Sequence, residues 1–194
     1  MLDIRKYLPE DQLALVFKKY EVAFDESHEQ RVHSYATSLF HALIQDKQWA
    51  DEKLALLQYC AYLHDIGHFI HENKHDKHTK YLIAHDHVFD CVPDRLRSML
   101  AIIAGGHRKS ISNKIREHTK DEQYIILQLA GILRIADAID YTRESNIRIE
   151  DMYMDNHQFC IHLCGYPSPT VIKRISEKSA LFREIFQSEI RVVF

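Results

Sequence analysis

Apolar residues recur at the three- and four-residue spacing of a helix from about residue 9 to about residue 140. The first predicted helix opens at Pro9-Glu10-Asp11, where a proline and acidic side chains suit a first turn. The same periodicity predicts five more helices. Three have approximate limits at residues 25–44, 93–105 and 121–141, one carries Leu54, Leu57 and Ala61 and stops near residue 67, and one begins near residue 78. This long stretch is therefore predicted to be a bundle of helices.

Beyond about residue 145 the pattern changes to the alternation of apolar and polar residues that is typical of strands. Two such runs flank the turn-like pair Asp155-Asn156, which predicts a β-hairpin. A helix with one apolar face and a final strand are expected after it, over residues 171–186 and 190–194. The sequence thus predicts a mainly α protein in two parts, a helical domain over residues 1–144 and a small α+β appendage over residues 145–194.

Composition and charge exclude several classes of protein. The 194 residues are 46% hydrophobic and 27% charged, as in an ordinary folded domain, and no apolar run approaches the roughly 20 residues that cross a bilayer. The N-terminus lacks the apolar segment of a secretory signal, and four Cys form no disulfide framework, so we expect a cytoplasmic protein without a membrane partner. A net charge of −3 argues against a nucleic-acid partner, and the 5 Gly leave no Gly-rich phosphate loop.

Histidine and aspartate stand at the ends of four apolar helical stripes. His28 begins one stripe, His64, His107 and Asp137 end three others, and Asp65 follows His64 directly. Burying these groups without partners costs several kcal/mol, and one shared cation satisfies all of them. A hydrogen-bonded core histidine is the simpler interpretation for any single one, but the set favours a metal site. Mixed imidazole and carboxylate ligands suit Mn, Fe, Ni or Zn.

Three segments carry a resemblance to a known family: LHDIGHFIHENKHDKHTKYLI (63–83), GGHRK (105–109) and LRIADAIDYTR (133–143). They resemble the C-terminal HD module of the exopolyphosphatase/guanosine-pentaphosphatase (Ppx/GppA) family, and the order H…HD…D resembles the HD-domain metal phosphohydrolases. The resemblance covers nearly the whole chain and implies an HD-domain helical bundle with a small C-terminal α+β subdomain. In that family the phosphate-chain chemistry belongs to two actin-like domains with Gly-rich loops. These residues contain no counterpart of those domains, so we do not expect that chemistry here.

The resemblance also implies a set of metal ligands. His78 and His107 match the extra histidines of HD proteins that bind two metals, in which Asp65 bridges the two ions. His75 competes with His78 for that role and is expected nearer the rim. The implied cofactor is one or two divalent ions of Mn, Fe, Ni, Mg or Zn. The full set of implied ligands is His28, His64, Asp65, His78, His107 and Asp137.

The expected reaction is hydrolysis of a small phosphorylated substrate, such as a nucleotide, by metal-activated water. Arg108, Lys109 and Arg143 are the candidate substrate-binding residues, although solvated charges at a helix end explain Arg108 and Lys109 equally well. Asp65, His68 and Lys109 are the expected catalytic residues. His68 is assigned either protonation of the leaving group or a hydrogen bond to a ligand. A homodimer is implied by the resemblance alone, and a non-catalytic regulatory or dimerising module is the alternative function.

Other histidines and acids are interpreted without a metal. Asp86, in the second HD-like pair His85-Asp86, is expected in an exposed loop, and His33 and His41 are expected on the surface. The strand face with Cys160 and His162 is expected to be packed rather than half of a zinc site. Asp140 is expected to hydrogen-bond a ligand or to cap its helix.

Overall fold

The structure is a computed structural model that describes residues 2–22, 27–144, 146–165 and 167–194, and it is mainly helical. The α-helices before residue 146 are α1 (Glu10–Tyr20), α2 (His28–Leu43), α3 (Ala50–Leu63), α4 (His75–His85), α5 (Asp94–Gly105) and α6 (Lys120–Ile139). Four short 3-10 helices lie between or before them: η1 (Ile4–Lys6), η2 (Ile66–Phe69), η3 (His87–Phe89) and η4 (Asn113–Glu117). The remaining elements are β1 (Arg148–Asp155), β2 (Gln158–Cys164), α7 (Pro169–Lys178), α8 (Ala180–Phe186) and β3 (Glu189–Val193). The expected mainly α class with a small C-terminal α+β part is confirmed.

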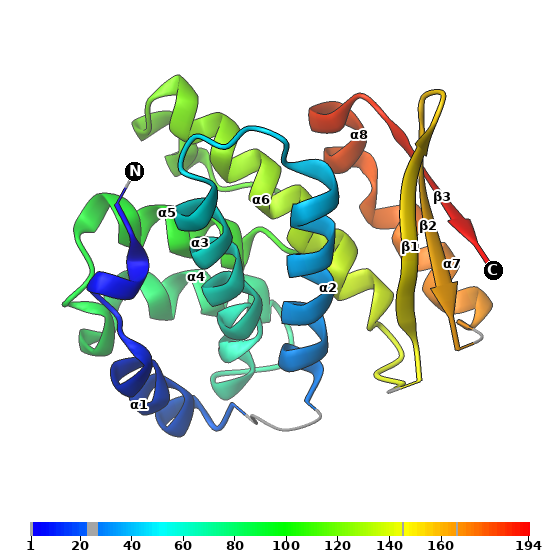
Figure 1. Ribbon diagram of the computed structural model, residues 1–194. Coiled ribbons are helices and arrows are strands. Elements are labelled where there is room, and N and C mark those ends of the chain that lie inside the picture. Colours follow the sequence, from blue (N-terminus) through cyan, green and yellow to red (C-terminus); the bar gives the residue numbers. More distant parts are fainter. Residues whose placement is uncertain (1, 23–26, 145, 166) are drawn as a thin grey trace.

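Helix α6 is the central element of the fold. Thr119 and Glu122 form a capping box at its start, which fixes where the helix begins. Every residue from Leu129 to Ile139 is buried, as expected for a helix that is apolar on all sides. Helices α2, α3 and α5 contact α6, and so do α7 and α8 from the C-terminal part, as Figure 1 shows. The last turn of α6 therefore lies where both parts of the chain meet.

The C-terminal part is a three-stranded sheet with two helices. Strands β1 and β2 pair antiparallel as the predicted hairpin, and Asn156 in its turn has the positive φ of 53° that asparagine tolerates. Strand β3 pairs parallel to β2, so the sheet order is β1-β2-β3 and the crossover runs through α7 and α8 (Figure 1). The helix predicted over 171–186 is two helices, because the chain turns at Ser179.

The C-terminal part packs against the helical bundle. Phe182 of α8 is fully buried, and its backbone passes 3.7 Å from the position that a Cβ on Gly131 of α6 would take. The Tyr35 hydroxyl of α2 donates a 2.6 Å hydrogen bond to the Ile147 carbonyl oxygen. Contacts of this kind fix α7 relative to the end of α6. The division into domains at residue 144 stays a prediction.

Two predicted helix limits differ from the observed ones. Helix α3 ends at Leu63, and η2 follows from Ile66, so the expected single helix to residue 67 is wrong. Helix α4 begins at His75, three residues before the predicted start at residue 78. The start expected near residue 25 lies outside the described residues, and within them α2 begins at His28 after the capping residue Ser27.

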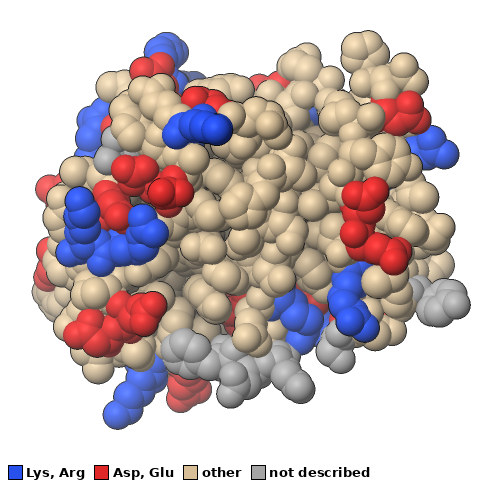
Figure 2. All heavy atoms as spheres, viewed as in Figure 1, with Lys and Arg blue, Asp and Glu red and all other residues tan. Residues whose placement is uncertain are grey.

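The surface of the described residues shows neither a membrane span nor a single sign of charge. No described helix is long and apolar enough to cross a membrane. Figure 2 shows basic and acidic side chains mixed around the periphery of one face, with uncharged residues across its centre. Basic side chains gather at the rim of the cavity described next, beside Glu72 and Glu177.

Candidate metal centre

A cavity of about 530 Å³ opens where the ends of α2, α5, α6 and α7 meet η2 and the start of α4. Its floor is made of imidazoles and carboxylates, and its rim carries basic side chains. The floor residues that line it are His28, Asp65, His68, His75, His107 and Asp137. The basic rim residues are Arg108, Lys109, Arg143, Arg174 and Lys178. His64, which is fully buried, lies directly beneath this floor.

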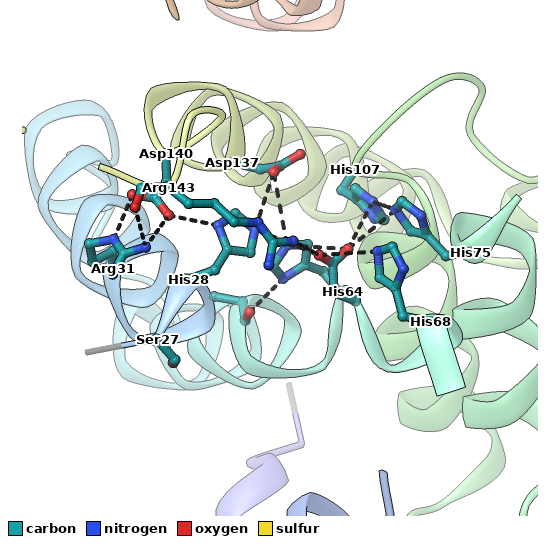
Figure 3. Close-up of polar contacts among 12 residues, drawn as sticks. Ser27, His28, Arg31, His64, His68, His75, His107, Asp137, Asp140 and Arg143 are labelled. Atoms are coloured by element: carbon teal, nitrogen blue, oxygen red, sulfur yellow. Dashed lines mark hydrogen bonds and ion pairs between the residues drawn. The ribbon is translucent and has the colours of Figure 1, made fainter. Parts of the chain in front are cut away.

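The imidazole rings converge on one carboxylate, as Figure 3 shows for the labelled histidines. Asp65 Oδ1 lies 3.2 Å from His75 Nε2, 3.6 Å from His107 Nε2 and 3.6 Å from His64 Nε2. Asp65 Oδ2 lies 3.7 Å from His28 Nε2. The Nε2 atoms also meet in pairs, His28 with His64 at 3.1 Å and His75 with His107 at 3.1 Å. Asp65 therefore lies between two pairs of histidines.

The outer nitrogen of each ring is already bound to an oxygen. His64 Nδ1 donates to the Ala61 carbonyl at 2.7 Å, and His107 Nδ1 donates to the Ala104 carbonyl at 2.6 Å. Since a carbonyl oxygen only accepts, both rings carry their proton on Nδ1 and expose a lone pair on Nε2. His75 Nδ1 lies 3.1 Å from the Glu72 carbonyl and 3.4 Å from Arg108 Nη1, so its Nδ1 side is also in contact with neighbouring groups. An outward hydrogen bond that fixes the tautomer is the usual arrangement of a metal-binding histidine.

His28 receives the same support from a carboxylate. Its Nδ1 lies 2.7 Å from Asp140 Oδ2, and Arg31 donates to the other oxygen of Asp140 from Nε at 2.7 Å. The expectation that Asp140 hydrogen-bonds a candidate ligand is confirmed. Sequence reasoning missed Arg31, although its position three residues after His28 places both on the same side of α2.

Burial and neighbouring charges shift the pKa values of the cluster in opposite directions. Burial opposes a proton on His28, but the carboxylates of Asp137 and Asp140 outweigh it and raise the pKa of His28 to about 9. Burial lowers the pKa of His107 to about 3, and the neighbouring His64 adds to this effect. Burial alone raises a carboxyl pKa, yet the surrounding imidazoles hold the pKa of Asp65 well below its usual range. His107 is therefore neutral, and Asp65 ionised, at neutral pH.

This donor set fits divalent cations. Two groups have candidate ligand atoms within 4.8 Å of one another: His28, His64 and Asp65 in one, and Asp65, His68 and His75 in the other. Asp65 belongs to both groups, which is the arrangement of a carboxylate that bridges two ions. Nε2 lone pairs held 3.1 Å apart also repel each other unless a proton or a cation lies between them.

Local backbone structure brings Asp65 and His68 close to α4. A Cβ on Gly67 would lie 2.0 Å from the His75 carbonyl oxygen, so only glycine allows η2 to approach the first turn of α4 this closely. Thr79 joins the two elements, because its hydroxyl donates to the His64 carbonyl at 2.7 Å and accepts from the Gly67 N–H at 2.9 Å. The sequence HDIG therefore continues from a ligand pair into the contact that positions it.

The structure brings His75, and not His78, into the cluster. Because α4 starts at His75, this residue faces the cavity from the first turn, and His78 is not among the residues that line it. The structure therefore places His75 on the cavity floor and His78 outside the lining, whereas the ligand role of either residue stays a prediction. His68 is also present, with Nε2 3.5 Å from Asp65 Oδ2 and its ring stacked on His75 at 4.0 Å.

The predicted basic residues lie at the rim of the same cavity. Arg143 Nη2 is 3.5 Å from Asp65 Oδ2, and Arg108 Nη1 is 3.4 Å from His75 Nδ1. Lys109 lines the cavity as well. Arg134 has a different role, since its buried guanidinium donates to the carbonyl oxygens of Gly106 and Lys109. It holds the loop that carries His107.

Sequence reasoning missed four cavity residues in or near the C-terminal part: Tyr141, Arg174, Glu177 and Lys178. Lys178 of α7 forms an ion pair with Asp137 Oδ2. Arg174, one turn earlier, donates a 2.7 Å hydrogen bond to the Tyr141 hydroxyl, and its guanidinium lies 4.2 Å from the centre of that ring. The spacing of four residues between Arg174 and Lys178 marks one face of α7, but only the apolar face was used to predict this helix.

The residues interpreted without a metal give mixed outcomes. Asp86 lies in the expected loop, between α4 and η3, but its side chain is only 16% exposed, because it accepts 2.6 Å hydrogen bonds from Lys19 Nζ and from the Tyr20 hydroxyl. His33 is half-buried and stacks on Tyr62 at 4.6 Å, which corrects its expected surface position. His41 is exposed as expected. Among the described residues, the groups that could hold a metal do not include Cys160 or His162.

Comparison with protein families identifies a match over most of the chain. The model of the family described as Ppx/GppA phosphatase, domain III, matches residues 12–170, which include every cluster residue named above except those of α7 beyond residue 170. No curated protein matches the chain. The match spans most of the 194 residues and both halves of the cavity floor, so the chain belongs to the Ppx/GppA phosphatase family, of which it carries domain III.

Proposed function

We propose that this protein is a metal-dependent phosphohydrolase that acts on a nucleotide or another small phosphate ester. One observation carries the proposal: His28, His64, His75 and His107 each direct Nε2 at Asp65 while Nδ1 is bound to an oxygen. An inert core would satisfy its histidines within the fold, and apolar residues could replace a buried charged cluster at little cost in stability. Four Nε2 atoms that converge on one buried carboxylate support a bound cation.

The chain offers ligands for two ions. His28, His64, Asp65 and Asp137 would hold one, since Asp137 Oδ1 lies 3.5 Å from His28 Nε2 and 4.0 Å from His64 Nε2. Asp65, His75 and His107, with His68 beside them, would hold the other. This donor set suits Mn, Fe, Ni or Zn, and Mg is kept as a further candidate. When bound, such ions supply activated water at neutral pH.

The basic rim would bind the phosphate group. Arg108, Lys109 and Arg143 come from two separate loops that line the cavity, and guanidinium groups bind phosphate oxygens through paired hydrogen bonds. His68 has a 37% exposed side chain whose Nε2 is held 3.5 Å from Asp65 Oδ2. It would protonate the oxygen of the leaving group at the mouth of the cavity.

A nucleotide suits the shape of the site. The volume of about 530 Å³ lies within the range of roughly 300–1,000 Å³ that ligand cavities occupy. Tyr141 lines the same cavity and is 41% exposed, with Arg174 against its ring. Its exposed ring offers a surface on which a base would stack while the phosphate reaches the floor.

The experiment measures metal binding and hydrolysis separately. The purified protein is loaded with Mn²⁺, Fe²⁺, Ni²⁺, Zn²⁺ or Mg²⁺ in turn, its metal content is determined, and it is assayed against phosphomonoesters and phosphodiesters with and without a nucleoside. Asp65→Asn should lose bound metal and activity, whereas His41→Ala, which replaces an exposed histidine outside the site, should keep both. Absence of bound metal in the wild type refutes the proposal. Bound metal without hydrolysis of any ester favours the non-catalytic alternative.

A further inference from the structure

Lys178, the last residue of α7, lies beside the candidate metal centre and belongs to the C-terminal part. Val171 and Ile175 bury one face of α7, and Lys178, one turn beyond Ile175 along that face, reaches the end of α6. The Lys178 ammonium forms an ion pair with Asp137 Oδ2, and both side chains are only 13% exposed. Lys178 lies beyond residue 170, where the family match ends.

Lys178 occupies a carboxylate that the proposed function assigns to a cation. Asp137 directs Oδ1 toward the imidazoles of His28 and His64, and directs Oδ2 toward Lys178. An ammonium group and a divalent ion that share one carboxylate repel each other strongly when both are shielded from water. The two cations therefore compete for Asp137.

Arg143 pairs with Asp65 as Lys178 pairs with Asp137, but this second ion pair is weaker. Its Nη2 is 3.5 Å from Asp65 Oδ2, and its side chain is 59% exposed, so solvent screens the pair. Both carboxylates of the cluster thus carry a basic side chain that extends from the rim. Lys178 is the stronger competitor, because its pair with Asp137 is mostly buried.

A flexible stem allows Lys178 to exchange partners. Four rotatable bonds separate its ammonium group from the backbone, and Asp137 is its only side-chain partner among the described ion pairs. Arg174 is fixed by contrast, because it donates to the Tyr141 hydroxyl at 2.7 Å and pairs with Glu177 at 2.9 Å. Lys178 lines the cavity, so an ammonium displaced from Asp137 stays where a phosphate would bind.

We propose that Lys178 is a positioning residue that neutralises Asp137 when no metal is bound and turns to the substrate phosphate once a divalent ion takes that carboxylate. This inference rests on the proposed function and extends it to a coupling between the two ligands. Phosphate gives the displaced ammonium a new partner, so phosphate should strengthen metal binding and metal should strengthen phosphate binding by the same factor.

The experiment compares Mn²⁺ affinity, measured by titration calorimetry, with and without inorganic phosphate. The full chain is used as wild type, Lys178→Met, Lys178→Arg and Lys173→Met; Lys173 is an exposed lysine of the same helix. Without phosphate, Lys178→Met should bind Mn²⁺ at least roughly tenfold more tightly than wild type, because a competing charge is gone. Added phosphate should tighten binding in the wild type and in Lys178→Arg, but much less in Lys178→Met. Lys173→Met should match the wild type.

Each outcome decides the inference. Weaker or unchanged Mn²⁺ binding in Lys178→Met, in protein whose circular dichroism shows a folded chain, overturns it and leaves Lys178 as a support for Asp137. If the wild type binds no Mn²⁺ but Lys178→Met does, the competition stands and the proposed enzymatic function fails. If neither binds, both fail. In active protein, Lys178→Met should also raise KM for the phosphate ester more than it changes kcat.

Discussion

Asp140 allows the metal centre to be tested without replacing a proposed ligand. Its carboxylate is fully buried and accepts hydrogen bonds from His28 Nδ1 at 2.7 Å, from Arg31 Nε at 2.7 Å and from Arg31 Nη2 at 3.0 Å. Asp140→Asn keeps the size of the side chain and removes its charge. The change leaves the Arg31 guanidinium, which is 17% exposed, beside a neutral amide.

The expected loss of stability in Asp140→Asn follows from these three hydrogen bonds. Removing the charge of one partner in a buried pair costs roughly 3–5 kcal/mol. The amide oxygen still accepts one hydrogen bond, so we expect the free energy of unfolding of the metal-free protein to fall by about 3 kcal/mol. His28 also loses the carboxylate that orients it and raises the basicity of its ring. Loss of such outer support typically weakens metal binding by about 10- to 100-fold.

Urea denaturation measures the first effect and metal titration measures the second. Asp90→Asn is the matched control, because Asp90 is an exposed carboxylate that pairs with Arg97 at 2.8 Å and with His87 at 3.0 Å. Its replacement should change the free energy of unfolding far less than Asp140→Asn does and leave metal affinity unchanged. If Asp140→Asn resembled Asp90→Asn in both measurements, the assignment of the cluster as a supported metal centre would be wrong.

Three further predictions address the fold and the substrate. Gly67→Ala should lower the free energy of unfolding by about 3 kcal/mol or more, measured by denaturation, because its Cβ meets the His75 carbonyl at 2.0 Å. Burial raises the pKa of Asp86, but hydrogen bonds from α1 lower it by more, so that its pKa is about 2. Asp86 should therefore contribute about 1 kcal/mol to the free energy of unfolding above pH 4. Since the folded pKa is the lower one, the stability difference from Asp86→Asn should disappear as pH falls through about 2. Tyr141→Ala should raise KM for a nucleotide but not for a phosphate ester without a base, whereas Tyr124→Ala, at an exposed tyrosine outside the cavity, should change neither.

Helical periodicity was sufficient to find most of the cluster. His28, His64, His107 and Asp137 lie at the ends of apolar stripes, and the apolar faces of their helices do pack together. A stripe fixes the direction of a side chain relative to its own helix, and burial of all four stripes in one core leaves their polar ends near one another. The ligand role of these residues stays a prediction.

The choice between His75 and His78 could not be made from periodicity. The segment HENKHDKHTK is polar throughout, so no apolar stripe marks the face of the first turn of α4. Its start is set by Lys74, which takes a left-handed φ of 63° rather than acting as a side-chain cap. The burial of the Asp86 side chain was missed for a related reason, because its partners Lys19 and Tyr20 lie on a helix remote in sequence.

Lys178 shows what local patterns leave undetermined. The sequence predicts a helix with an apolar face there, but whether its basic face meets the metal centre depends on how α7 crosses α6. That crossing is set by the sheet, since α7 and α8 connect β2 to the parallel strand β3 and both helices contact α6. The C-terminal part is thus more than an appendage to the helical site. Its strands position α7, and the Lys178 ammonium at the end of α7 pairs with Asp137. A change that loosens the β2-β3 pairing, far from any proposed ligand, should therefore alter the charge balance of the metal centre.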